Sequence, residues 1–317
     1  MGEPAQGMTR RRAVAGGVLV VLGASAAAWA VAVPHPPGAG LPATVVRALA
    51  DCSAVVTLGL TVAPMLDTSR HRSELMKQAA APLASAAALW LLAELSRLVL
   101  GAAEAAAVPV STLGVAEAWQ FAYATSVGRS GLFSIAAAGL VAAMTLGLPR
   151  STPAVTATAG VAAVGLVART IGGHLSMSSP GAVAIAVHAL AAALWCGTLA
   201  ALALVVEHRG QWARVLPRFS QLALACVIAL LVGGIAGALV TVDSPTQLFA
   251  TGYGRVLLIK IALTVLLLAL AWRNRAQWLP AAKAHRVTAE VSRSRSLIEL
   301  AIMLVALTMA AALSVTG

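Results

Sequence analysis

Residues 181–206, GAVAIAVHALAAALWCGTLAALALVV, decide the fold class of this chain because they hold no Asp, Glu, Lys or Arg over 26 positions. About 20 apolar residues in a helix cross a hydrocarbon core of about 30 Å, and a helix satisfies its own backbone hydrogen bonds in lipid. The sequence predicts an all-α, polytopic transmembrane bundle of nine spans, a single membrane domain over 1–317, with the other spans at about 14–33, 43–66, 79–100, 131–148, 153–171, 220–241, 255–272 and 297–316.

The loops between these spans alternate in positive charge. Of the 22 Lys and Arg residues, 16 fall in loops that share one predicted side, and the opposite loops hold only Arg129 and Arg255. Lys and Arg are enriched in cytoplasmic loops, so we expect the N-terminus in the cytoplasm and the C-terminus outside. These loops account for the net charge of +11. The expected partner of that charge is membrane lipid, not nucleic acid.

Ionisable side chains inside a membrane are costly, which makes them functional candidates. Arg47 and Asp51 are four residues apart and share a helix face, and Glu94 and Arg97 are three apart. We expect these charges to form a connected polar network, with Lys260 paired to Asp51 or Glu94. The predicted topology puts all the intramembrane charges and the one intramembrane imidazole in the outer half: Arg47, Asp51, Glu94, Arg97, Arg169, His188 and Lys260.

The predicted outer loop between the fifth and sixth spans combines an imidazole with a thioether, at His174 and Met177. This ligand pair suits copper, particularly Cu(I). On one unbroken helix His174 and His188 would be about 21 Å apart. Gly172, Gly173 and Pro180 interrupt the helix, so the loop can fold back toward His188. His174, Met177 and His188 are therefore the candidate metal ligands.

Other catalytic signatures are absent from the sequence. It contains no Walker loop, nucleophile elbow, Cys-x-x-Cys or HExxH motif. We therefore expect neither an enzyme nor an ATP-driven pump. Cys52, Cys196 and Cys226 all fall within spans, so no disulfide framework is expected.

The stretch from His188 to Gly197 reads H-A-L-A-A-A-L-W-C-G, and three further short stretches follow it in order. Together they resemble the copper resistance protein D family, with the strongest similarity over about 170–280. The further stretches are Arg218-Phe219-Ser220, Thr251-Gly252-Tyr253-Gly254-Arg255 continuing to Lys260, and Asn274-Arg275.

This resemblance implies a bacterial inner-membrane protein that moves copper from the outer side into the cytoplasm. Trp195 and Tyr253 would then shape the site. The chain departs from the family's pattern at Thr198, where a second glycine is common, and it lacks a Met-rich outer segment. The resemblance carries over His174, His188, Trp195, Tyr253, Arg255 and Lys260.

Two other functions remain open from the sequence. The chain can be a delivery or assembly factor that passes copper to an oxidase, with a periplasmic copper-binding protein as partner. It can also be a haem-binding redox protein, although haem ligation through two histidines needs both at facing depths, and His188 is the one well inside a span. The copper oxidation state and the direction of transport stay open.

Overall fold

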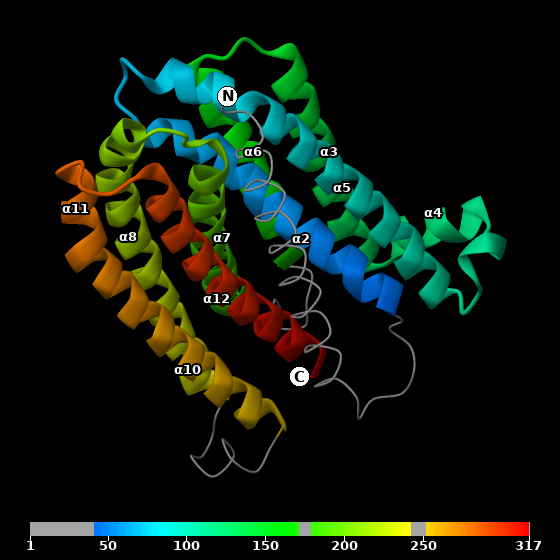
Figure 1. The fold of residues 1–317 in the computed structure, drawn as a ribbon. Coiled ribbons are helices and arrows are strands. Elements are labelled where there is room, and N and C mark those ends of the chain that lie inside the picture. Colours follow the sequence, from blue (N-terminus) through cyan, green and yellow to red (C-terminus); the bar gives the residue numbers. More distant parts are fainter. Residues whose placement is uncertain (1–40, 171–178, 242–251, 317) are drawn as a thin grey trace.

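The computed structural model describes residues 41–170, 179–241 and 252–316, and helices make up nearly all of these ranges (Figure 1). The first predicted span, 14–33, lies outside the described residues. The helices are α2 (Leu41–Val62), η1 (Ala63–Leu66), α3 (Arg72–Ala105), η2 (Val110–Thr112), α4 (Val115–Ala124), α5 (Ser126–Gly147), α6 (Thr152–Thr170), α7 (Ser179–Val205), α8 (Arg209–Thr241), α10 (Gly252–Arg273), η4 (Asn274–Trp278), α11 (Leu279–Lys283) and α12 (Ala289–Thr316).

Each of the eight remaining predicted spans coincides with one of these helices, and η1 completes the span at 43–66. The all-helical fold class is confirmed for the described residues. Five of the described helices are long and apolar enough to cross a membrane, while the count of nine spans and their orientation remain predictions. These five are Val45–Leu66, Arg72–Ala105, Ser126–Gly147, Val183–Val205 and Arg209–Ile235.

Helix α2 lies at the centre of the bundle. Its apolar window is 61% buried, against 22–39% for the other four membrane-length helices. It packs on α3 and α6 on one side and on α7 on the other, and α7 in turn carries α8 and α12 (Figure 1). Helix α10 packs mainly on α12. Helix α2 therefore contacts both α3 and α6 from the N-terminal part of the chain and α7 from the C-terminal part.

Two glycines let α2 and α7 cross with their backbones in contact. A Cβ atom on Gly59 would overlap the carbonyl group of Gly197, and one on Gly197 would overlap the carbonyl oxygen of Val55. Small residues permit this kind of approach between membrane helices. The crossing fixes the height of the motif residues Trp195 and Gly197 against α2.

One end of the bundle collects the junction after α2, the α5–α6 and α7–α8 turns, η4 and α11, at the upper left of Figure 1. We call it the basic end because it carries the predicted cytoplasmic charges. Helix α4 and the end of α12 lie toward the opposite end (Figure 1). In α4, Trp119 and Tyr123 are exposed, with ring centroids 4.7 Å apart.

Candidate functional site

An ion pair between two of the predicted intramembrane charges joins α2 to α3. Arg97 Nη1 lies 3.5 Å from Asp51 Oδ1. Arg47, one turn before Asp51, is close enough to affect Arg97 electrostatically. The structure thus brings Arg47, Asp51 and Arg97 together, and the partner of Asp51 is an arginine of the neighbouring helix.

Glu94 is a buried carboxyl that connects α3 to α5. Ser134 Oγ donates a hydrogen bond of 3.0 Å to Glu94 Oε1, and Trp90 Nε1 lies 3.4 Å from the same oxygen. Only 1% of Glu94 is exposed. The sequence predicts that Glu94 is an intramembrane charge, but no local pattern predicts that Ser134 donates a hydrogen bond to it.

His188 lies half-buried on α7, beside a gap in α8. A Cβ atom on Gly233 would lie 3.5 Å from His188 Nδ1 and 3.6 Å from its Cβ, so the absence of a side chain at Gly233 leaves space for the imidazole. Gly234, the next residue, would present its Cβ to open space. The two glycines therefore have different surroundings, and Gly233 is the one that faces His188.

The motif tryptophan and its neighbours are buried further along α7. Trp195 is 5% exposed, Cys196 is 7% exposed and Thr198 is fully buried. Trp195 Nε1 and Thr198 Oγ1 have no hydrogen-bond partner among the described residues. Thr198 lies at the α2–α7 crossing, where its amide nitrogen is near Gly59.

His174 and Met177 lie outside the described residues. Tyr253, Arg255 and Lys260 lie on the first turns of α10, but their side chains are outside the described part, so the expected pairing of Lys260 stays a prediction. Within the described ranges no three His, Cys, Asp or Glu side chains are grouped closely enough to hold a metal ion. The described part of the chain therefore supplies His188 but no complete ligand set.

The basic end contains a polar clamp that the sequence reasoning missed. Asp67, which is fully buried after η1, accepts two hydrogen bonds from Arg214 of α8, at 3.0 Å from Nε and 3.1 Å from Nη2. Arg218 Nη1 donates to the carbonyl oxygen of Leu66 at 3.2 Å. Arg214 and Arg218 are among the predicted cytoplasmic charges, and in the structure they also hold η1 to α8.

Gln211 and Arg293 complete the connections at this end. Gln211 Nε2 donates to Glu74 Oε1 and Gln78 Oε1 of α3, at 3.0 and 3.2 Å. Arg293 of α12 donates to the carbonyl oxygens of Ala203 and Val206 at 3.1 Å each, which satisfies carbonyls at the end of α7. Positive side chains are favourable at a helix C-terminus because of its partial negative charge.

A third buried carboxyl lies in a predicted span but not in its predicted outer half, contrary to the expectation for the intramembrane charges. Glu299 of α12 falls inside the predicted span 297–316, near its basic end, and is 2% exposed. Asn274 Nδ2 donates to Glu299 Oε2 at 2.7 Å. A Glu within the predicted span 297–316 is the sequence signal that points to this position.

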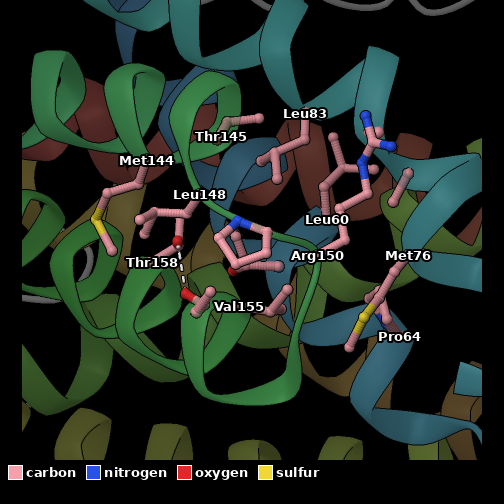
Figure 2. Close-up of a pocket in the computed structure, with 15 residues that line it drawn as sticks. Leu60, Pro64, Met76, Leu83, Met144, Thr145, Leu148, Arg150, Val155 and Thr158 are labelled. Atoms are coloured by element: carbon pink, nitrogen blue, oxygen red, sulfur yellow. Dashed lines mark hydrogen bonds between the residues drawn. The ribbon is translucent and has the colours of Figure 1, made fainter. Parts of the chain in front are cut away.

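A small cavity of about 40 Å³ lies between the basic-end halves of α2, α3, α5 and α6 (Figure 2). The hydroxyls of Thr145 and Thr158 point back to their own helices, at 2.7 Å from the Val141 carbonyl and 2.8 Å from the Ala154 carbonyl. Figure 2 shows the thioethers of Met76 and Met144 on different sides of the cavity. No carboxyl, thiol or imidazole lines it, so it lacks a metal-ligand set.

The comparisons with known proteins cover most of the chain. Residues 213–314 match the family model for copper resistance protein D, and residues 39–185 match the model for the N-terminal domain of copper resistance protein D-like proteins. No curated protein and no solved structure matches the chain. The motif from His188 to Gly197 lies between the two matched ranges. With both halves of the bundle matched, this chain belongs to the copper resistance protein D family.

Proposed function

We propose that this chain binds copper at the outer face of the cytoplasmic membrane of a bacterium and moves it inward, as a transporter and not as an enzyme. Its family membership supports a role in copper resistance, and its apolar helices support a multi-pass membrane location. The observation that carries the site is the placement of His188 beside Gly233. His188 is about 13 Å along α7 from Ser179, on the half away from the basic end.

The proposed ligand set joins His188 to His174 and Met177, which precede the first residue of α7. Two imidazoles and a thioether are donors that copper accepts, with the thioether favouring Cu(I). The outer pair of Asp51 and Arg97 would keep the neighbouring charges balanced as a cation arrives. Trp195, Tyr253 and Arg255 would shape the path below and beside the site.

Copper titration of purified variants tests the ligand set. We expect His188→Ala to weaken copper binding most, because that imidazole is held by a helix. Met177→Leu should weaken Cu(I) binding more than Cu(II) binding. Affinity should fall as the pH drops through about 6.5, since protonated imidazole cannot bind a metal. His208→Ala, at the basic end, is the matched control and should bind like wild type. Wild-type binding by both His174→Ala and His188→Ala would place the site elsewhere.

Copper uptake into vesicles that contain only this protein separates transport from delivery. Uptake of copper into the vesicle lumen supports the transporter. Binding without uptake supports the alternative, a delivery or assembly factor that needs an oxidase or a periplasmic copper-binding partner. A Soret band in the purified protein would instead favour the haem-binding alternative.

A further inference from the structure

The cavity beside Glu299 combines a buried carboxyl with a mainly apolar lining. It has a volume of about 140 Å³ and lies among α8, α10, η4 and α12. Most of its lining is apolar, and its polar side chains are Glu299, Asn274, Arg275 and Ser220. Since a buried water needs about 10–15 Å³ and two to four polar partners, the cavity has room for several waters.

The neighbours of Glu299 can accommodate both the charged and the neutral carboxyl. Asn274 donates to Glu299 Oε2 at 2.7 Å, and a rotated amide would present its oxygen to a protonated carboxyl instead. The buried indole N–H of Trp195 faces the same carboxyl closely enough to interact electrostatically, without the geometry of a hydrogen bond. Trp195 Nε1 is therefore a second N–H donor close to Glu299.

Glu299 has no ion pair among the described residues. The charged and titratable groups near it come from α7, η4 and α12. From α7, Cys196 interacts with it electrostatically. From η4, Arg275 lines the same cavity and is exposed at its other side. On α12 itself Arg295 lies one turn earlier, and Arg293 is bound to carbonyls of α7. The lining from α8 adds one hydroxyl and apolar side chains.

The π-helical turn η4 sets this arrangement. Asn274 is its first residue, and Trp278 at its end donates to Ser292 Oγ of α12 at 3.1 Å. These two contacts fix η4 against α12 and direct Asn274 toward Glu299. Single π-helical turns inside helices are frequent at functional sites. Glu299 itself lies about 15 Å along α12 from Ala289, well within the helix.

An ionised carboxyl without a cationic partner is costly in an apolar bundle, whereas a protonated one costs much less. We propose that Glu299 is a proton-binding site, reached by water through this cavity from the basic end. In the forward step a hydronium ion in the cavity gives its proton to a carboxylate oxygen of Glu299 and leaves a water molecule. A second step rests on the proposed copper transport: Glu299 exchanges its proton with the basic end as copper crosses, so that protons are the coupling ion.

Labelling with dicyclohexylcarbodiimide tests the proton site without copper. The reagent adds to protonated carboxyls in apolar surroundings and leaves a stable adduct that peptide mass spectrometry can locate. We expect labelling at Glu299 that declines as the pH rises between about 5 and 9. Glu290→Gln, an exposed acid on the same helix, is the matched control and should leave this labelling unchanged. Wild-type protein that is not labelled at Glu299, or whose labelling does not change with pH, overturns the proposal.

Two variants sharpen the test. Asn274→Leu removes the donor to the carboxylate, and since such a donor favours the charged form, labelling of Glu299 should persist to higher pH. An unchanged pH profile in this variant argues against the site. Glu299→Gln keeps the size of the side chain and its hydrogen bond from Asn274 but cannot take up a proton. If that variant fails to fold, labelling of wild type and of Asn274→Leu still decides the question.

Copper and proton movement in vesicles test the second step. With a pH-sensitive dye inside, copper added outside should change the luminal pH for wild type, and Glu299→Gln should abolish this change while outer copper binding stays at the wild-type value. Uptake by Glu299→Gln at the wild-type rate overturns the coupling. If wild-type protein moves no copper into the vesicles, the proposed transport is wrong. The labelling experiment still tests Glu299 as a proton-binding site in that case.

Discussion

At the residue scale, the adjacent glycines Gly233 and Gly234 differ in their contact with His188, so substitutions at the two positions can be compared. We expect the series Gly233→Ala and Gly233→Leu to weaken copper binding progressively. A methyl group would meet His188 Nδ1 at 3.5 Å, an ordinary contact, whereas a leucine side chain needs the space that the imidazole occupies. Changes that disturb the orientation of a metal ligand typically cost about 10–100-fold in metal affinity, and we expect a loss in this range if His188 is displaced. Copper titration of the purified variants measures it.

Gly234→Leu is the control for this series. Its Cβ would meet nothing within 4 Å, and the residue is exposed. Both substitutions replace a helical glycine by leucine, so they change helix propensity equally, by about 1 kcal/mol. Equal copper affinities for Gly233→Leu and Gly234→Leu would show that the space beside His188 is unimportant for binding.

At the scale of elements, the clamp between η1 and α8 should stabilise the basic end. Asp67→Asn should lower the unfolding free energy, because Asp67 is fully buried and Arg214 would lose its charged partner. Removing one member of a buried pair costs about 3–5 kcal/mol. We expect a smaller loss here, because Arg214 keeps 28% of its side chain exposed to share its charge with solvent.

Thermal unfolding in detergent measures this loss, and a double-mutant cycle of Asp67→Asn with Arg214→Gln isolates the pair. Arg209→Gln is the control, since Arg209 is an exposed residue on the first turn of the same helix. If Asp67→Asn unfolds at the temperature of wild type, the clamp does not contribute to stability. If the cycle shows no coupling, the two residues act separately.

The same clamp shows what the sequence could predict at this scale and what it could not. Hydropathy placed eight helices correctly because each span is a local feature of about 20 residues. Asp67 and Arg214 are 147 positions apart, and their pairing depends on the packing of α2, α7 and α8, which no local pattern contains. The contact of Gly233 with His188 and that of Asn274 with Glu299 also join residues on different helices. His188 and Glu94 were therefore visible as candidates in the sequence, whereas their neighbours Gly233 and Ser134 were not.

At the scale of the whole molecule, the bundle has two chemically different ends. The basic end is held together by the Asp67–Arg214 clamp and by Arg293 at the end of α7. The half away from it holds the Asp51–Arg97 pair and His188. The proposed copper ligand His188 and the proposed proton site Glu299, which lies near the basic end beside η4, are therefore in different halves of the bundle.

The orientation of this bundle in the membrane is the remaining prediction. Helix α12 begins at the basic end and finishes toward the opposite end, so the C-terminus and the α11–α12 loop should face opposite sides (Figure 1). Since Lys and Arg favour the cytoplasmic side, alkaline phosphatase fused after Gly317 should be active. The same reporter inserted after Lys283 should be inactive. The reverse pair of activities would invert the whole bundle and move His188 to the cytoplasmic half. Equal activities at the two sites would mean that α12 does not cross the membrane, and the nine-span topology would then be wrong.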